Sequence, residues 1–192
     1  MSTRSRIGIL KDDHIESVYC HFDGYLEHVG MLLVNHYNSL EKAQALISLG
    51  DISILGKNTG YRDDNNPDGT QDYYRMRNDP IAPVKDDDME SYLDAISLCE
   101  VNYLYLFAGG VWLYSSDGNS WSLVSDRLRE LLEKMSGERK RMAMRLEDLE
   151  LRAERIEDYN DEGEYDTELL AIKTECKTLR TALEEFKNWI NQ

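Results

Sequence analysis

Apolar residues recur at alternating intervals of four and three along the C-terminal third of the chain. The first run begins at Leu128 and ends at Ile156, and only Arg139 interrupts its apolar character. The run occupies positions 128, 132, 135, 139, 142, 146, 149, 153 and 156. This heptad spacing is typical of a helix that packs along one stripe against a partner helix.

A second run with the same spacing follows a polar interval. It occupies Leu169, Ile172, Cys176, Leu179, Leu183, Phe186 and Ile190. The interval from 159 to 164 contains Asn160, Asp161 and Gly163, which favour a turn. We therefore predict that residues 126–192 form an antiparallel helical hairpin, a coiled coil with its turn near 159–164.

The first 125 residues alternate short strand-like and helix-like segments. Strand patterns cover 6–10, 17–22, 103–114 and 120–124, and helical patterns cover 27–37, 39–49 and 88–98. Residues 57–88 hold all three prolines and many Asp, Asn and Gly residues, which predicts a long irregular loop. The simplest architecture is an α+β domain over 1–125. It would contain a small, mainly antiparallel four-stranded sheet covered by helices on one face.

The charge of the chain restricts its partners. A formal net charge of −15 disfavours binding to nucleic acid or to anionic lipid, because like charges repel within a Debye length. Three separated cysteines, Cys20, Cys99 and Cys176, indicate neither a disulfide framework nor a zinc site. No signal peptide or membrane span is evident. These features predict a cytoplasmic protein without a cofactor.

Side chains that could take part in catalysis or ligand binding are concentrated between positions 19 and 25. In a strand, Val18 and Cys20 would share one face, and Tyr19 and His21 the other. One interpretation makes Cys20 a core residue and Asp23-Gly24 a turn. The other assigns a polar pocket to His21, Asp23, Tyr25 and His28.

A short acidic segment resembles part of a calcium loop. Asp64, Asn66 and Asp68 alternate, and Gly69 follows, as in the oxygen-donor spacing of such loops. Arg75 stands where a bidentate Glu is expected, so an ordinary polar turn is the competing interpretation. The histidines show no paired spacing for a metal ion.

One basic run lies inside the first heptad pattern. Arg139, Lys140 and Arg141 follow one another, with Arg145 close behind and acidic residues on both sides. Ion pairs within the helix are the simple interpretation, and an anchor for an anion or an acidic partner is the alternative. The acidic stretches 86–88 and 157–168 leave open a role as a mimic of a nucleic-acid backbone.

The N-terminal segments resemble a group of bacteriophage and prophage proteins that have no assigned activity. The segments that carry the resemblance are residues 2–9 (STRSRIGI), 19–25 (YCHFDGY), 27–30 (EHVG) and 49–53 (LGDIS). That group usually has Trp where this chain has Phe22 and Pro where it has Leu26. The resemblance covers about the first 55 residues, with an echo in 103–121. It implies an infected or lysogenic bacterium as the setting, but no reaction.

Two functions agree with this pattern. The first is a non-enzymatic, phage-encoded inhibitor of a host enzyme or antiphage defence complex, acting through its acidic surface and hairpin. The second is a small enzyme or ligand-binding domain built around His21, Asp23 and Tyr25. We also expect a homo-oligomer formed through the hairpins, since two helices leave apolar surface uncovered. Its contacts would include Leu146, Leu149, Leu169 and Ile172.

Overall fold

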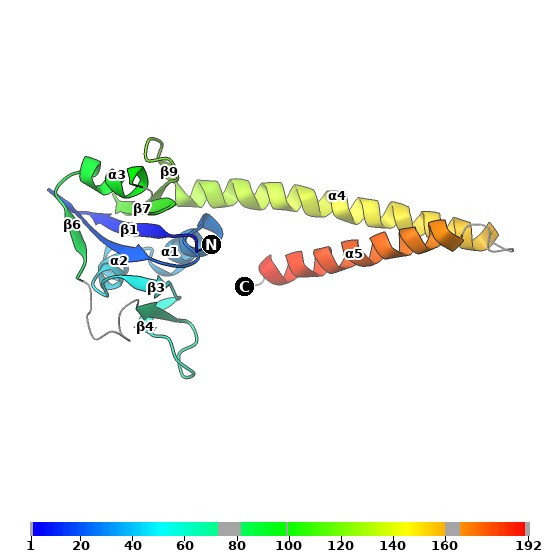
Figure 1. Cartoon of the computed structure of the whole chain (residues 1–192), viewed down its shortest axis with the longest axis horizontal. Helices are drawn as coiled ribbons and strands as arrows, with labels where there is room; N and C mark the ends of the chain where they lie inside the picture. The colour runs from blue at the N-terminus through cyan, green and yellow to red at the C-terminus, as the bar shows by residue number, and fades with distance from the viewer. Residues whose placement is uncertain (1, 73–81, 99, 160–165, 191–192) are drawn as a thin grey trace. The chain divides into compact units, whose positions relative to one another are not determined.

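A computed structural model describes residues 2–72, 82–98, 100–159 and 166–190 of the chain. The chain divides into two compact units, Met1–Arg129 and Glu130–Gln192. The first unit contains a sheet with its covering helices. The second consists of most of one long helix and a shorter helix after it (Figure 1).

The first unit is built on a mixed sheet. Within the described residues it has nine strands: β1 (Ser5–Leu10), β2 (Ile15–Cys20), β3 (Ile52–Ile54), β4 (Asn58–Tyr61), β5 (Gly69–Asp72), β6 (Val84–Asp86), β7 (Tyr103–Ala108), β8 (Val111–Ser115) and β9 (Ser122–Leu123). Their order is β4-β5-β3-β2-β1-β7-β8-β9, and β6 pairs with β2. The α+β class is therefore retained, but the prediction of a small, mainly antiparallel four-stranded sheet is wrong.

Two hairpins and one parallel contact form the centre of the sheet. β1 and β2 pair antiparallel with Ile7 opposite Val18, and β7 and β8 form the second antiparallel hairpin. The turn of the second hairpin is Gly109-Gly110, whose φ angles of 58° and 84° suit glycine in a two-residue turn. β1 and β7 join the hairpins in parallel, with Ser5 opposite Tyr103.

Three of the additional strands come from short polar segments. β4, β5 and β6 lie inside the range 57–88 that was expected to be an irregular loop, while residues 73–81 lie outside the described part. Their sequences, NTGY, GTQD and VKD, lack apolar alternation. Because pairing with a neighbouring strand, rather than burial of a face, places these segments in the sheet, the hydrophobic pattern did not indicate them.

Helices cover both faces of the sheet, and not one face as predicted. On one face lie the π-helix η1 (Leu26–Gly30), α1 (Met31–His36) and α2 (Leu40–Ile47), over Ile7, Val18 and Tyr105. On the other face lies α3 (Met89–Ser97), which packs Tyr92 against Leu104 and Leu106. A parallel pair at the centre of a sheet is commonly buried on both sides, which agrees with this arrangement.

Two helices of this unit begin at capping side chains. Ser39 precedes α2 and accepts a hydrogen bond from the backbone N–H of Lys42. Asp88 precedes α3 and accepts one from the backbone N–H of Ser91. Gly50, with a φ of 75°, follows the end of α2 and turns the chain toward β3.

The second unit is an antiparallel helical hairpin. Most of α4 (Val124–Tyr159) and all of α5 (Asp166–Ile190) lie in it. Leu149, Ile172 and Cys176 form its buried core. Leu146, Ala153, Ile156 and Leu179 are partly buried around them. The predicted heptad positions thus meet across the two helices, and the expected turn residues 160–164 lie outside the described part.

Candidate functional site

Four ion pairs join the two helices on the surface of the hairpin. They are Arg145–Glu175, Arg152–Glu168, Lys173–Glu157 and Arg180–Glu150. In two of them α4 supplies the cation, and in the other two it supplies the acid. Within each type, the residues that α4 contributes are seven positions apart, and so are those of α5. On one side of the buried seam, α4 therefore supplies the cations and α5 the acids. On the other side the roles of the two helices are reversed.

This charge pattern specifies how the helices pair. In antiparallel pairing, an advance of seven residues on α4 meets a retreat of seven on α5, so every cation meets an acid. A parallel pairing would place like charges together, which is how coiled coils exclude wrong partners. A shift by one heptad would still set Arg152 beside Glu175 and Glu157 beside Arg180, so the pattern selects the direction of the helices and not the register. Exposed ion pairs contribute at most about 1 kcal/mol each, so their main effect is on helix direction.

A basic band interrupts the acidic surface of the hairpin. Residues 134–146 contain five basic side chains and one acidic side chain, whereas residues 147–168 contain two basic and eleven acidic ones. Arg139, Lys140 and Arg141 are exposed, and none takes part in an ion pair among the described residues. The simple expectation of ion pairs within the helix is therefore not met for these three cations.

Exposed apolar side chains lie in both charged zones. Leu132, beside the basic band, and Met144, within it, are 46% and 70% exposed. Leu151 and Leu170 are 50% and 68% exposed in or next to the acidic zone. An apolar side chain surrounded by one sign of charge is suited to a partner that offers the opposite sign.

The oligomer contacts expected from the sequence are placed differently. Leu149 and Ile172 are 1% and 6% exposed because the hairpin buries them itself. Leu146 and Leu169 are half-buried. The hairpin itself therefore covers Leu149 and Ile172, and the homo-oligomer expected through these contacts stays a prediction.

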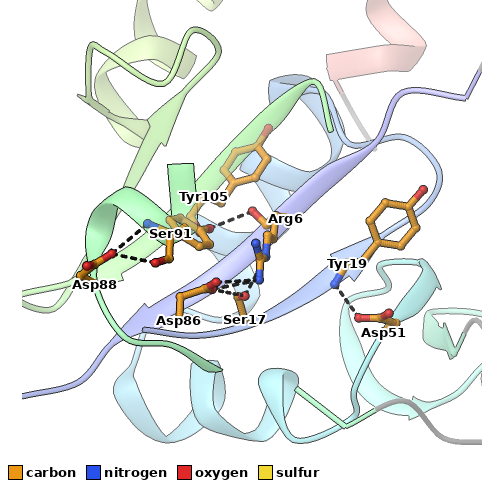
Figure 2. Close-up of polar contacts among 9 residues, drawn as sticks. Arg6, Ser17, Tyr19, Asp51, Asp86, Asp88, Ser91 and Tyr105 are labelled. Carbon is orange, nitrogen blue, oxygen red and sulfur yellow. Dashed lines mark hydrogen bonds and ion pairs between the residues drawn. The ribbon is translucent and has the colours of Figure 1, made fainter. Parts of the chain in front are cut away.

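The sheet unit contains a buried polar cluster that the sequence did not indicate. The Arg6 guanidinium donates to both carboxylate oxygens of Asp86, at 3.2 and 2.9 Å, and to Ser17 Oγ at 2.8 Å (Figure 2). It also lies 5.4 Å from the centre of the Tyr92 ring. The Tyr92 hydroxyl is within 3.1 Å of the carbonyl oxygen of Arg6 and 2.9 Å of that of Tyr105. Burial raises the pKa of Tyr92, so this phenol stays protonated.

These contacts connect four elements on the α3 face of the sheet. Arg6 belongs to β1, Ser17 to β2, Asp86 to β6 and Tyr92 to α3. The donors and acceptors satisfy one another, and the side chains of Arg6 and Asp86 are 13% and 8% exposed. The cluster therefore fixes β6 and α3 to the central hairpin, a structural role.

Asp51 adds a further polar contact, to the backbone of β2. Its carboxylate accepts a hydrogen bond of 2.8 Å from the backbone N–H of Tyr19 (Figure 2). Burial raises the pKa of Asp51, although the Tyr19 N–H and the Arg6 charge act in the opposite direction. The Tyr19 hydroxyl in turn lies 2.9 Å from His21 Nδ1.

The candidate pocket residues form two groups. His21 contacts Tyr19, and its pKa is lowered by burial and by the nearby charge of Arg4. The rings of Tyr25 and His28 lie 6.1 Å apart at the start of η1. The pKa of Tyr25 is raised by burial and by the charge of Asp23.

The backbone of this segment is tightly held. Gly24 donates to the carbonyl of Thr3 at 2.9 Å and accepts from the Tyr105 hydroxyl at 3.0 Å. A Cβ at Gly24 would come within 2.8 Å of Ser5, and Asp23 has a φ of 55°. These contacts describe a structural turn between β2 and η1.

Cys20 is a core residue. Its side chain is fully buried and donates to the carbonyl of Phe22 at 3.3 Å, and burial raises its pKa to about 12. A thiol in this state is a poor nucleophile, because the thiolate is the reactive form.

Two of the three calcium-loop candidates, Asn66 and Asp68, are engaged with protein groups. The amides of Asn66 and Asn58 exchange hydrogen bonds of 3.0 and 3.1 Å, and Asp68 pairs with Lys57 at 3.2 Å. Asp63 caps the turn by accepting from the backbone of Asn65 and Asn66. Among the described residues there is no cluster of three His, Cys, Asp or Glu side chains that could hold a metal ion.

Comparison with known proteins places the chain in no family. No family model, no curated protein and no solved structure matches it. In the described part of the chain, none of the helices combines the length and apolar character that crossing a bilayer requires.

Proposed function

We propose that this chain is a non-enzymatic, phage-encoded interaction protein that inhibits a host enzyme or an antiphage defence complex in the bacterial cytoplasm. The helical hairpin and the acidic surface would make the contacts. The phage setting comes from the resemblance of the N-terminal segments. The observation that carries the binding role is the surface of the hairpin, where ordered charges surround exposed apolar side chains.

The hairpin is suited to binding because its two helices are held together before a partner arrives. Its own packed core and ion pairs hold them, so the exposed side chains keep fixed relative positions. A preorganised surface loses less conformational entropy on association than a flexible one. Met144 and Leu170 supply apolar contact area, and the surrounding charges supply selectivity.

Both units favour a basic partner. Residues 1–129 carry 20 acidic and 11 basic side chains, and residues 130–192 carry 17 and 11. A negative surface attracts positively charged partners over roughly 10 Å at 0.1 M salt. It also disfavours the wrong partners that carry net negative charge.

The test is capture of host proteins on the immobilised chain, with phage plating on the host as the functional measure. In the variant Glu147→Lys/Glu154→Lys, two exposed acids of the hairpin that make no described ion pair are reversed. The control Asp12→Lys/Glu41→Lys makes the same change in charge in the sheet unit. We expect the hairpin variant, but not the control, to lose both a captured host complex and its effect on phage plating. Equal loss in both variants would contradict a hairpin contact.

A ligand-binding or enzymatic site near His21, Asp23 and Tyr25 is the second candidate. It is favoured by one observation: His28 Nε2 and Ser5 Oγ are buried without a hydrogen-bond partner in the described structure. Replacement of His21 by Ala is the test. Loss of biological function with an unchanged melting temperature would support this site, whereas unchanged function would remove it.

A further inference from the structure

We propose that the base of the hairpin, where its two helices move apart, binds an amphipathic helix of the host partner and completes a three-helix bundle. That helix would carry one acidic residue in the middle of its apolar face, opposite Arg139. The inference names the element by which the partner binds, so it rests on the function proposed above. The surface concerned, the basal face, consists of Met135, Arg139, Met142 and Ala143 of α4 and Ala182 and Leu183 of α5.

The described packing of the two helices occupies part of their length. The buried core and the four ion pairs lie between positions 145 and 157 of α4 and between positions 168 and 180 of α5. Toward the C-terminal end of α5 the two helices lie farther apart (Figure 1). Leu149 in the packed part is 1% exposed, whereas Met142 and Leu183, the next seam positions toward the base, are half-buried. The seam is therefore open at the base.

The residues that flank the seam also change at the base. In the packed part, charged residues on both sides of the seam form the ion pairs between the helices. Seven positions before Glu150 the chain has Ala143, and seven positions after Glu175 it has Ala182. Half-buried Leu131 adds apolar surface to the start of this part of α4. A narrow seam flanked by charges suits two helices, whereas a wider apolar face is typical of a helix in a larger bundle.

Arg139 indicates the chemistry of the third helix. It occupies a seam position between Met135 and Met142, and its side chain is exposed in the described structure. A helix that covered the basal face would bury this guanidinium among apolar side chains, which is costly unless an acid pairs with it. The docking helix therefore needs one carboxylate inside its apolar face. Its outward-facing residues can still be basic, in agreement with the net charge of the chain.

A second copy of this chain is less suited to the basal face. Two copies related by an axis along the hairpin would bring both Arg139 side chains to the same level of the bundle. An axis across the base, near position 137, would place them within about one helical turn of each other. Like charges in an apolar bundle repel, so the page of residues that forms this face favours a foreign helix over a copy of itself.

The probe is a fluorescent synthetic peptide of about three heptads, roughly 30 Å long as a helix. It has leucine at its a and d positions and one glutamate at the central a position, and a matched peptide has lysine in place of that glutamate. Fluorescence anisotropy with the full chain should give a dissociation constant roughly tenfold lower for the glutamate peptide. The net charge of −15 favours the lysine peptide, so the opposite preference indicates a local cation.

Two variants with matched controls locate the site. Arg139→Glu should reverse the preference between the peptides, whereas Lys177→Glu makes the same charge change at an exposed position of the packed part and should leave it unchanged. Ala182→Lys puts a charge into the basal face and should weaken binding of the glutamate peptide roughly tenfold. The control Thr178→Lys, at an exposed position of the same helix, should not. Circular dichroism checks that the variants keep their helical content.

Capture of host proteins on the immobilised chain connects this site to the proposed function. An excess of the glutamate peptide should displace a captured host complex, and the lysine peptide should not. A captured complex that the glutamate peptide leaves in place would overturn the inference, while the proposed function would stand. Peptide binding without capture of any host complex would support the helix site and remove the host partner.

Three results would overturn the basal site itself: no binding of the glutamate peptide, equal binding of the two peptides, or a preference that Arg139→Glu leaves unchanged. Light scattering at tens of micromolar tests the other occupant. A dimer of the unmodified chain that Ala182→Lys dissociates would assign the basal face to a second copy instead.

Discussion

The sheet unit and the helical hairpin are stabilised in different ways. In the sheet unit, helices on both faces bury side chains such as Ile7, Leu104 and Tyr105 completely. Among the residues of the hairpin whose burial is described, Leu149, Ile172 and Cys176 form the buried core, and charged residues line both sides of it. The packing of the sheet unit is therefore specified mainly by the fit of its buried side chains. The pairing of the two hairpin helices is specified mainly by the order of their charges.

The largest effect is expected from breaking the buried ion pair of the sheet unit. Replacing Arg6 by Ala leaves the Asp86 carboxylate buried without its partner, which should cost about 3–5 kcal/mol of unfolding free energy. Urea denaturation followed by tryptophan fluorescence would measure this loss. The double variant Arg6→Ala/Asp86→Ala removes both charges and should be more stable than Arg6→Ala alone. The opposite order would show that the pair is not the cause.

A smaller and separate effect is expected in the hairpin core. Replacing Leu149 by Ala removes a buried side chain and should cost about 2–4 kcal/mol. Because the hairpin has its own core, we expect the helical signal in far-ultraviolet circular dichroism to melt earlier while the near-ultraviolet signal of the sheet unit is unchanged. Replacement of exposed Leu151 by Ala is the control. A single shared transition at lower temperature would argue against separate units.

The charge order of the hairpin predicts an effect of about 0.5–1 kcal/mol. Replacing Arg145 by Glu places an acid beside Glu175 and Asp148 and should lower the thermal stability of the hairpin. Replacing Glu175 by Arg as well should restore part of the loss. High salt should reduce the difference between these variants, because it screens exposed charges. A loss that persists at high salt would indicate a packing defect.

The smallest expected effect concerns Asp51. Its pKa is raised in the folded protein, mainly by burial, so the folded state binds its proton more tightly than the unfolded state. The associated stability is present below the ordinary aspartate pKa and is lost as pH rises through the folded pKa. Replacing Asp51 by Asn keeps an acceptor for the Tyr19 N–H and should stabilise the protein slightly at neutral pH. Urea denaturation at several pH values should show this gain growing from acidic to neutral pH.

Local patterns in the sequence predicted the local elements but not the sheet. Strand patterns in 6–10 and 17–22 indicated the first hairpin, and helical patterns over 39–49 and 88–98 indicated α2 and α3. The contact between β1 and β7 joins segments far apart in the chain, and no local pattern specifies such a partner. A parallel pair of strands at the centre of a sheet is commonly covered by helices on both faces. The hydrophobic periodicity of the sequence does not reveal that β1 and β7 form such a pair.

The same difference applies to the candidate sites. Arg6 and Asp86 are 80 positions apart, so no spacing rule connects them. The ion pairs of the hairpin, in contrast, follow seven-residue repeats that are visible in the sequence. These repeats are Arg145 and Arg152, Glu150 and Glu157, Glu168 and Glu175, and Lys173 and Arg180. The pocket proposed at 19–25 grouped side chains by proximity in the chain, and the structure places His21 with Tyr19 while Tyr25 lies beside His28.

The central parallel pair also affects how the chain folds during synthesis. β1 emerges from the ribosome first, yet its neighbour β7 begins at Tyr103, and the backbone of Arg4 bonds to Asn102 across 98 positions. At about 5–20 residues per second, β1 waits several seconds for this partner. During that interval the β1–β2 hairpin has an unpaired edge, which is a site for chaperones or aggregation. The described contacts between α4 and α5 join two helices that are neighbours in the chain, so the hairpin can form soon after its last residues appear.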